Sequence, residues 1–214
     1  MNNLEILARK YGTDKRTNDI GQPKIYHGYT DEYFKHLSVM QDKSFNLLEI
    51  GVREGWSHFM WADFFPKATI YGIDNFKEEG LNVTKEEIEE HGNIKIIVGD
   101  QADKDALNQL KDIKFDVIID DGSHLSYDQQ RSFKILWNNL YRGGFYFIED
   151  LAVCLNRNFR EFEDMASSTL TWLEAMKKGI IPFSYYINSE DMKTVFSQIE
   201  YINIVGEIAI IKKR

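Results

Sequence analysis

The sequence predicts an α/β protein built on a doubly wound, mostly parallel sheet of seven strands. Short apolar runs rich in β-branched and aromatic residues alternate with amphipathic segments of helical period, which is the order of successive β-α units. Five such strands follow one another, and a hairpin at the end of the chain adds two more. The 214 residues are enough for one domain with a sizeable core.

The first 42 residues are expected to form a helical segment that acts as a lid. A short helix over residues 4–10 ends at Gly12, and a long loop rich in Gly, Asp, Thr and Asn covers residues 12–28. A second helix follows over residues 31–40. Long loops in compact domains are commonly functional lids, so residues 1–42 are expected to lie over a ligand.

The central part of the chain is expected to supply five parallel strands and the helices between them. The predicted strands cover residues 45–50, 69–73, 94–98, 115–119 and 145–148. Helices are predicted over residues 56–65, from the capping box Thr84–Glu87 to His91, over 104–111, and from the capping sequence Ser126–Gln129 to a stop at Gly143-Gly144.

The last sixty residues change character. An amphipathic helix is predicted over residues 158–178, closed by Gly179. Residues 194–202 and 207–212 are expected to form two strands joined by a tight turn. This hairpin completes a Rossmann-like sheet of seven strands, one of them antiparallel. No repeat or linker interrupts the pattern, so residues 1–214 are expected to form a single domain.

Composition excludes several classes of function. The chain has 34 acidic against 26 basic residues, a net charge of −8, which argues against general binding to nucleic-acid backbones. Cys154 is the one cysteine, so disulfides and thiolate metal clusters are not expected. No apolar stretch approaches 18 residues, and the N-terminus lacks the plan of a signal peptide. We therefore expect a cytoplasmic protein with no membrane partner.

The turn after the first strand has the features of a nucleotide-type site. Gly51 and Gly55 permit positive φ angles and let a ligand approach the backbone, with Glu49 and Ser57 on either side. The spacing is not the Gly-x-Gly-x-x-Gly of dinucleotide folds, which disfavours a nicotinamide dehydrogenase, and no phosphate loop follows. Two glycines four residues apart are equally well explained by a tight turn.

Acidic residues at the ends of the first three strands strengthen this interpretation. Glu49 ends the first strand, Asp74 ends the second and Asp100, followed by Gln101, ends the third. Asp74 is placed to bind both hydroxyls of a ribose, and Asp100 to reach an adenine edge. Helix capping would explain any single acid but not all three together.

A second acidic cluster follows the fourth and fifth strands. Asp120, Asp121 and His124 come after one apolar run, and Glu149 and Asp150 come after the next. Carboxyl ends of neighbouring parallel strands share one rim of the sheet. The sequence therefore predicts a divalent metal site with a base beside it, because hard cations prefer oxygen ligands and imidazole titrates near neutral pH. Simpler roles are also open: Glu149-Asp150 as a cap, His124 as a hydrogen-bonding loop residue, and Asp120 as a loop anchor.

These motifs resemble those of class I S-adenosylmethionine-dependent methyltransferases. The fuller set is similar to the metal-dependent sugar O-methyltransferases of the mycinamicin type, which modify macrolide deoxysugars. The matching segments are residues 11–15, 26–29, 48–51, 119–124 and 143–151.

The resemblance implies roles for particular residues. Asp121, Glu149 and Asp150 would bind Mg²⁺ or another divalent cation, and His124 would be the general base that deprotonates a sugar hydroxyl. The residues implied for S-adenosyl-L-methionine are Glu49, Gly51, Gly55, Ser57, Asp74, Asp100, Gln101 and Asp120. Tyr26, His27 and Tyr29 are candidates to contact the acceptor, although a packing role for these rings is equally consistent with the sequence.

Several acceptors and one non-enzymatic role remain open at this point. The sugar hydroxyl could belong to a nucleotide-sugar, a glycan or a glycosylated natural product. A catechol or another small diol is the first alternative, because metal-dependent catechol methylation uses a similar set of three ligands. A non-catalytic S-adenosylmethionine-binding protein is the second. The oligomeric state is open, with a homo-oligomer as one outcome.

Overall fold

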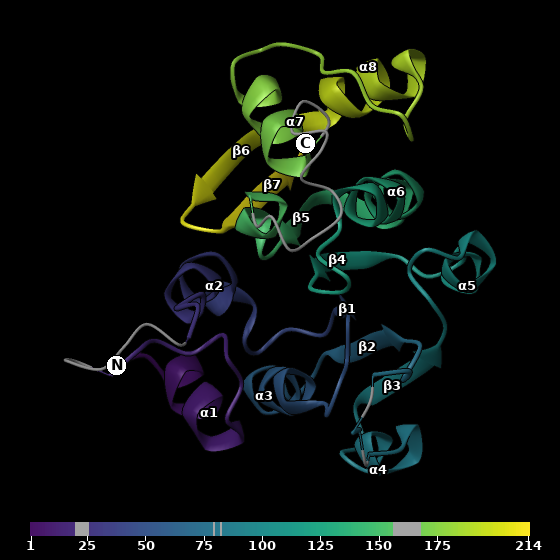
Figure 1. Cartoon of the computed structure of the whole chain (residues 1–214). Coiled ribbons are helices and arrows are strands. Elements are labelled where there is room, and N and C mark those ends of the chain that lie inside the picture. The colour runs from purple at the N-terminus through teal and green to yellow at the C-terminus, as the bar shows by residue number, and fades with distance from the viewer. Residues whose placement is uncertain (20–25, 79, 82, 156–167) are drawn as a thin grey trace. The chain divides into compact units, whose positions relative to one another are not determined.

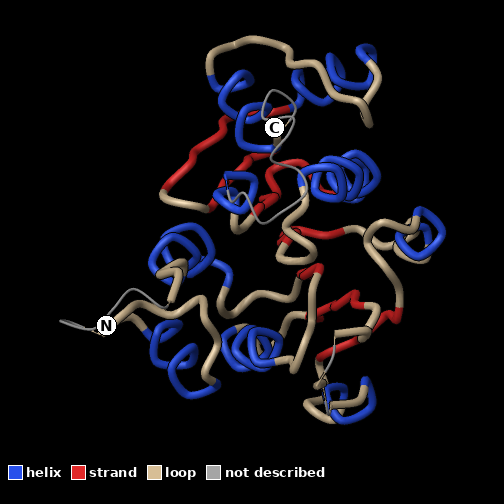
Figure 2. The backbone as a smooth tube through the Cα atoms, in the orientation of Figure 1, coloured by secondary structure: helices blue, strands red, loops and turns tan. Residues whose placement is uncertain are grey.

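The computed structural model describes residues 1–19, 26–78, 80–81, 83–155 and 168–214. It divides into two compact units, Met1–Val98 and Gly99–Arg214, which are described in turn. Figure 1 labels the elements of both units, and Figure 2 shows the strands and helices alternating along much of the chain.

The N-terminal unit contains three parallel strands. They are β1 (Asn46–Ile50), β2 (Thr69–Asp74) and β3 (Ile94–Val98), in the order β3-β2-β1. Helices α3 (Trp56–Phe64) and α4 (Lys85–Glu89) connect them, and α4 begins with the predicted capping box between Thr84 and Glu87. The side chains of β1 from Leu47 to Ile50 are all buried, as expected for a parallel strand covered on both faces.

Two further helices precede β1 in this unit. Helix α1 (Asn3–Tyr11) ends at Gly12, whose φ of 80° is the left-handed cap conformation that favours glycine. Helix α2 (Thr30–Leu37) runs into a short 3₁₀ turn, η1 (Ser38–Met40). Helix α1 packs against both α2 and α3. The helical character predicted for the first 42 residues is therefore confirmed, while the lid function stays a prediction.

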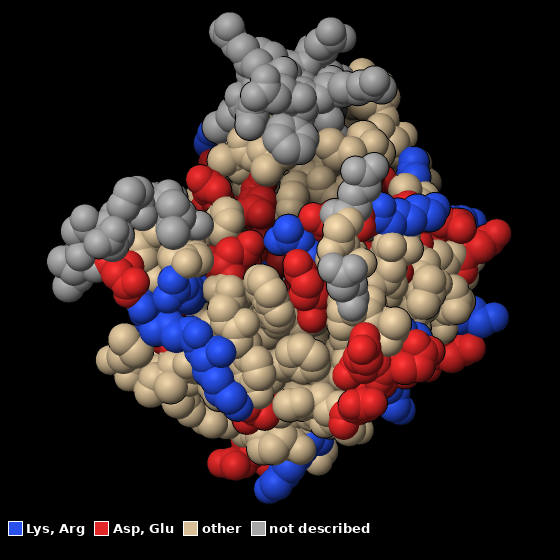
Figure 3. Space-filling model, turned by 60° about the horizontal axis from the view of Figure 1, so that its bottom comes forward, with Lys and Arg blue, Asp and Glu red and all other residues tan. Residues whose placement is uncertain are grey.

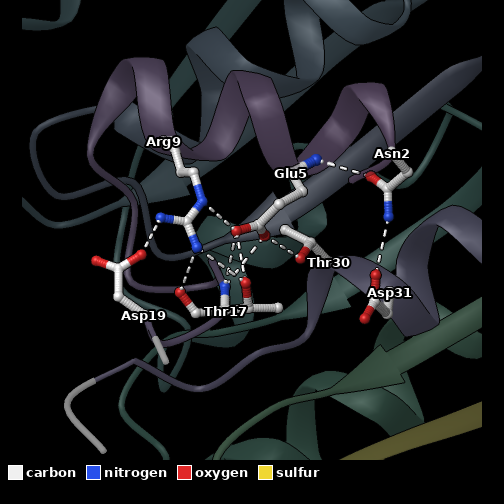
Figure 4. A network of polar contacts seen from close by, with 7 residues as sticks. All are labelled: Asn2, Glu5, Arg9, Thr17, Asp19, Thr30 and Asp31. Carbon is white, nitrogen blue, oxygen red and sulfur yellow. Dashed lines mark hydrogen bonds and ion pairs between the residues drawn. The ribbon is translucent and has the colours of Figure 1, made fainter. Parts of the chain in front are cut away.

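A buried glutamate fastens the loop between α1 and α2 (Figure 4). Glu5 is 3% exposed, and its carboxylate accepts hydrogen bonds from Arg9 at 2.6 Å, from the backbone and hydroxyl of Thr17, and from the hydroxyl of Thr30 at 2.6 Å. Burial raises the pKa of Glu5, but these hydrogen bonds outweigh it and the net pKa is lowered. Glu5 thus connects Thr17 of this loop and the first residue of α2 to helix α1.

The C-terminal unit contains the other four strands. They are β4 (Phe115–Asp120), β5 (Leu140–Ile148), β6 (Ile199–Val205) and β7 (Ile208–Lys213), in the order β4-β5-β7-β6. Strand β5 is parallel to β4, and β7 runs antiparallel to both β5 and β6. The predicted seven strands, with one antiparallel member in a C-terminal hairpin, are confirmed.

Helices of the C-terminal unit surround these strands. Their bounds are α5 (Lys104–Asn108), α6 (Ser126–Leu136), η2 (Trp137–Asn139), η3 (Leu151–Leu155), α7 (Thr169–Lys177) and α8 (Ser189–Gln198). The predicted helix over residues 158–178 is represented by α7, and residues 158–167 lie outside the described part of the chain. Trp172 of α7 is 1% exposed and packs edge-on against Phe133 of α6, so it is a core residue.

The strand predicted over residues 194–202 is wrong in its first half. Residues Thr194–Gln198 belong to α8, and the strand begins at Ile199. Asn188 caps this helix by accepting hydrogen bonds from two backbone N–H groups of the first turn. Met192 and Val195 are buried on one side of it, and this packing overrides the strand preference of the β-branched residues.

Two expected helix boundaries are also corrected. Gly143 and Gly144 do not end α6, because the helix ends at Leu136 and both glycines lie within β5. A Cβ atom on Gly144 would lie 2.8 Å from the backbone oxygen of Asp116, so glycine is required by the close approach of the neighbouring strand. Ser126 is the first residue of α6 rather than its side-chain cap, and its hydroxyl instead accepts a hydrogen bond from the backbone of Thr169.

Within the described residues, no helix is both long and apolar enough to span a membrane. The face drawn in Figure 3 carries acidic and basic side chains interspersed with uncharged ones. The absence of a nucleic-acid partner stays a prediction from the net charge.

One aspartate joins three segments of the N-terminal unit. Asp63 on α3 accepts hydrogen bonds from the Lys10 ammonium at 2.7 Å and the Tyr11 hydroxyl at 2.6 Å, and its other oxygen lies 3.0 Å from Nε2 of His91. Partial burial raises the pKa of Asp63, but these donors outweigh burial and lower it to about 2.

We expect Asp63→Asn to lower the free energy of unfolding by about 1 kcal/mol at pH 7. The folded pKa lies below the value of about 4 in an unfolded chain, so the charge contributes stability above pH ~4 and loses it as the pH falls towards ~2. Urea denaturation at pH 7 and at pH ~2.5 should therefore show a difference between the two proteins that shrinks with acid. Asp112→Asn, at an exposed position, is the matched control. A difference that does not change with pH would contradict the assignment.

Candidate functional site

The first predicted site residue, Glu49, lies at the centre of a buried polar cluster. Its side chain is fully buried and forms an ion pair with Lys15 at 3.2 Å. The other carboxylate oxygen accepts hydrogen bonds from Ser57 at 2.9 Å and from the indole of Trp61 at 3.0 Å, and Nδ1 of His58 lies 3.4 Å from it. Burial raises the pKa of Glu49, while Lys15 and the two donors act in the opposite direction. Glu49 thus connects β1 to helix α3 and to Lys15.

The turn between β1 and α3 is closed over Asp74. Gly51 and Gly55 have φ angles of 90° and 81°, which glycine adopts without strain and other residues do not. Asp74 at the end of β2 accepts hydrogen bonds from the backbone N–H groups of Val52 at 2.7 Å and Arg53 at 2.9 Å. Its second oxygen accepts from the N–H of Phe76 at 2.7 Å. The structure therefore brings Gly51, Gly55 and Asp74 together, and Asp74 organises the turn besides being a candidate ribose ligand.

The aromatic residues proposed to contact the acceptor have different environments. Tyr26 is half-buried under the Arg16 guanidinium, which lies 3.7 Å from the ring centroid. His27 is also half-buried and stacks on Tyr29 at a centroid distance of 5.1 Å. Tyr29 is only 4% exposed, so its ring is part of the core of this unit. Tyr26 and His27 remain the better candidates for contact with a ligand.

In the C-terminal unit, the residues after β4 and β5 converge. His124 lies between two carboxylates: its Nδ1 is 4.0 Å from Asp121 and its Nε2 is 3.6 Å from Asp150. One potential ligand atom from each of these residues lies within 4.8 Å of the others, and the same limit holds between Asp121 and Glu149. The structure thus brings Asp121, His124 and Asp150 together and brings Glu149 close to Asp121, while their roles as metal ligands and base stay predictions.

Backbone strain marks the same places. Among the described residues, the non-glycine residues with positive φ are Arg53, Phe76, His124 and Asp150, at 51° to 59°. Each of them follows the end of a strand: β1, β2, β4 and β5 respectively. Such conformations are costly for residues with a side chain, of the order of 1 kcal/mol or more, and they cluster at functional sites. His124 and Asp150, which face one another, are both in this state.

We name residues 121–125, which carry the predicted metal ligand Asp121 and the predicted base His124, the metal loop. Asp120 and Gln101 are buried and adjoin this loop. Asp120 is fully buried, and burial raises its pKa although Ser132 and Gln101 donate to it. Gln101 also accepts a hydrogen bond from the backbone of Ser123 at 2.6 Å. Asp100 is half-buried and accepts from the N–H of Ala102 at 2.9 Å. Cofactor contacts of these three residues stay predictions.

Two residues that hydrogen-bond to Asp120 and Glu149 were not predicted from the sequence. Ser132 and Gln129 lie on the buried side of α6, where Ser132 donates to Asp120 and Gln129 donates to the backbone oxygen of Glu149 at 3.1 Å. Both residues lie at helical spacing from the apolar positions of α6, so the sequence places them on the face of the helix that packs on the core. Polar residues on such a face need buried hydrogen-bond partners, and this pattern could have identified them.

Residues 48–151 match the family model described as a methyltransferase domain. Residues 48–151 therefore form a methyltransferase domain. The match covers the turn after β1, the metal loop and the acidic pair after β5, so the resemblance drawn from these segments is confirmed.

Curated relatives of the chain are named as O-methyltransferases. L-olivosyl-oleandolide 3-O-methyltransferase of Streptomyces antibioticus is 30% identical over 95% of the chain and 51% of the relative. Mycinamicin VI 2''-O-methyltransferase of Micromonospora griseorubida is 34% identical over 69% of the chain and 36% of the relative. The chain therefore spans about half the length, or less, of these two proteins.

A solved structure supports the same fold. MycE methyltransferase of the mycinamycin biosynthetic pathway, in complex with Mg, SAH and mycinamycin VI, superposes with a TM-score of 0.77 and 26% identity. The alignment covers all of the chain and 55% of MycE. The α/β methyltransferase fold of the chain follows from this match and from its seven strands.

The Lys15–Glu49 pair should be essential to the stability of the N-terminal unit. We expect Lys15→Met to lower the free energy of unfolding by about 3 kcal/mol, because it leaves a buried carboxylate without its cation. Combining it with Glu49→Gln should recover part of this loss. Chemical denaturation of the single and double variants measures both effects. Lys35→Met, at an exposed ion pair, should change stability by no more than about 0.5 kcal/mol. Equal losses in the single and double variants would contradict the role of the charge.

Proposed function

We propose that this chain is an S-adenosyl-L-methionine- and divalent-metal-dependent O-methyltransferase that acts on a sugar hydroxyl. The observation that carries the proposal is the approach of His124 to Asp121 and Asp150 in the C-terminal unit, with two of these residues held in strained backbone conformations.

The residues present fit a hard divalent cation. Asp121, Glu149 and Asp150 offer carboxylate oxygens, the ligand type that Mg²⁺ prefers. The buried Nδ1 atom of His124 has no hydrogen-bond partner among the described residues, which is consistent with a polar site built for an additional group. Bound there, Mg²⁺ would polarise the acceptor hydroxyl and lower its pKa.

His124 is the residue proposed to remove the hydroxyl proton. An imidazole is suited to this step because its ordinary pKa lies near neutrality. Its ring lies between the carboxylates of Asp121 and Asp150, and its backbone has a positive φ of 59°. Either carboxylate would stabilise the imidazolium that forms as the proton is taken up.

In the N-terminal unit, the turn after β1 is proposed to hold the cofactor. Gly51 and Gly55 leave the backbone open to a close approach. Asp74 uses its carboxylate for three backbone hydrogen bonds, and a carboxylate has about four lone-pair sites. One site is left for a ribose hydroxyl, so the same residue can order the turn and bind the cofactor.

The acceptor is proposed to be a sugar of a glycosylated natural product. The curated relatives above are named for the O-methylation of L-olivosyl-oleandolide and of mycinamicin VI, and MycE was solved with mycinamycin VI. A nucleotide-sugar or a glycan would present the same hydroxyl. The cytoplasmic location and a homo-oligomeric state stay predictions from the sequence.

Removal of the metal should abolish methyl transfer. The test measures transfer from labelled S-adenosyl-L-methionine to a panel of glycosylated macrolides, nucleotide-linked deoxysugars and catechols. Treatment with EDTA should stop transfer to the accepted sugar and added Mg²⁺ should restore it. Full turnover after rigorous chelation would overturn the metal mechanism. Transfer to catechols alone would replace the sugar by the alternative acceptor.

His124→Ala should separate catalysis from cofactor binding. We expect the turnover number to fall by about 100-fold or more, because a general base is lost, while the Kd for S-adenosyl-L-methionine changes less than about twofold. Steady-state kinetics and isothermal titration calorimetry measure the two quantities. His91→Ala, in the N-terminal unit, is the control for loss of an imidazole outside the site. Collapse of cofactor binding in His124→Ala would show that the residue has been misassigned.

A further inference from the structure

The side chain of Gln101 joins two buried elements of the C-terminal unit. It is 7% exposed and lies in the segment that precedes α5. Its amide nitrogen donates to Oδ1 of Asp120 at 3.2 Å, and its amide oxygen accepts the backbone N–H of Ser123 at 2.6 Å. Only a side chain with a donor and an acceptor on the same group can make both bonds.

Asp120 is held firmly on its other side. Its second carboxylate oxygen accepts a hydrogen bond from Ser132 on α6 and lies 3.5 Å from the hydroxyl of Tyr146 on β5. Asp120 is fully buried, so it cannot turn towards solvent without leaving these donors unpaired. It is therefore a fixed point from which Gln101 is oriented.

Ser123 makes three hydrogen bonds that hold the metal loop. Besides donating its N–H to Gln101, it donates its hydroxyl to Asp128 at 2.8 Å and accepts the N–H of Leu125 at 3.3 Å. It stands two residues after Asp121 and directly before His124, whose backbone is strained. A strained conformation persists only where surrounding contacts impose it, and the bond to Gln101 is one of these contacts.

We propose that Gln101 is a positioning residue that holds residues 121–125 in the conformation that presents Asp121 and His124 together. This inference rests on the metal site of the proposed function. It gives Gln101 a role distinct from the cofactor contact expected from the sequence, and it makes the pairing of Gln101 with Asp120 part of the metal site's support.

The chain of contacts also reaches the segment that carries Asp100. Asp100 accepts the N–H of Ala102, and the Ala102 carbonyl accepts a hydrogen bond from Arg131 on α6 at 2.6 Å. Gln101 lies between these two anchored residues. The loop that carries a candidate adenine ligand is thus fixed to the same helix that supports the metal loop.

An exchange of amide and carboxylate tests the pairing. Gln101→Glu keeps the acceptor for the Ser123 N–H but sets two carboxylates against each other. Asp120→Asn alone presents an amide to an amide and loses the acceptor charge. In the double variant, the new amide at position 120 can donate to the new carboxylate at position 101, while its oxygen still accepts from Ser132. The pattern of hydrogen bonds is restored with the polarity reversed.

The readout is the affinity for Mn²⁺ alone, measured by electron paramagnetic resonance, with thermal unfolding recorded in parallel. We expect Gln101→Glu to weaken Mn²⁺ binding by about tenfold or more, as for other residues that orient metal ligands. The double variant should return to within about threefold of wild type. The control is Asn139→Asp: a buried amide in the same unit that donates to the carbonyls of Leu110 and Ile113 and does not touch the metal loop.

The outcomes distinguish failure of the positioning role of Gln101 from failure of the metal site. Asn139→Asp should lower the unfolding temperature and leave Mn²⁺ affinity unchanged. If Gln101→Glu does the same, or if the double variant is weaker than the single, the positioning role is overturned while the metal site stands. If the wild-type protein binds no Mn²⁺, both the metal-dependent function and this inference fail.

Discussion

The constraint on which the rest of the structure depends is the burial of a carboxylate at the end of a strand. Glu49 on β1 and Asp120 on β4 are both fully buried, and a buried charge is tolerated only when it is paired or fully hydrogen-bonded. Glu49 is matched by the Lys15 ammonium together with hydroxyl and indole donors. Asp120 is matched by neutral donors, Ser132 and Gln101. In each unit, these donors connect the buried carboxylate to segments outside its own strand.

This arrangement explains how strained residues persist at the candidate site. Arg53 and Phe76 adopt positive φ angles, and their N–H groups both donate to Asp74. His124 is equally strained and directly follows Ser123, whose N–H is bound by Gln101. Each hydrogen bond contributes about 1 kcal/mol, which is of the same order as the strain at one such residue. Loops held by several buried acceptors can therefore keep side chains in positions that a free loop would not.

Local features of the fold could be predicted from the sequence, whereas the partners of buried groups could not. The end of α1 at Gly12 and the capping box at Thr84 follow from interactions within a few residues. Lys15 pairs with Glu49, which lies far from it in the sequence. The motif of residues 11–15 did not predict this partner. The strand expected from Thr194 failed for the same reason, because packing of α8 decided the conformation.

The two adjacent acids after the apolar run of β4 lie in different environments. Asp120 is the last residue of β4, and Asp121 is the first residue of the loop that follows. Asp120 is buried and supports the loop, while Asp121 retains 21% side-chain exposure and approaches His124. Asp150, with 14% side-chain exposure, approaches the imidazole from the other side. A buried acid whose partners fix its position and an acid proposed to bind the metal can thus be adjacent in sequence.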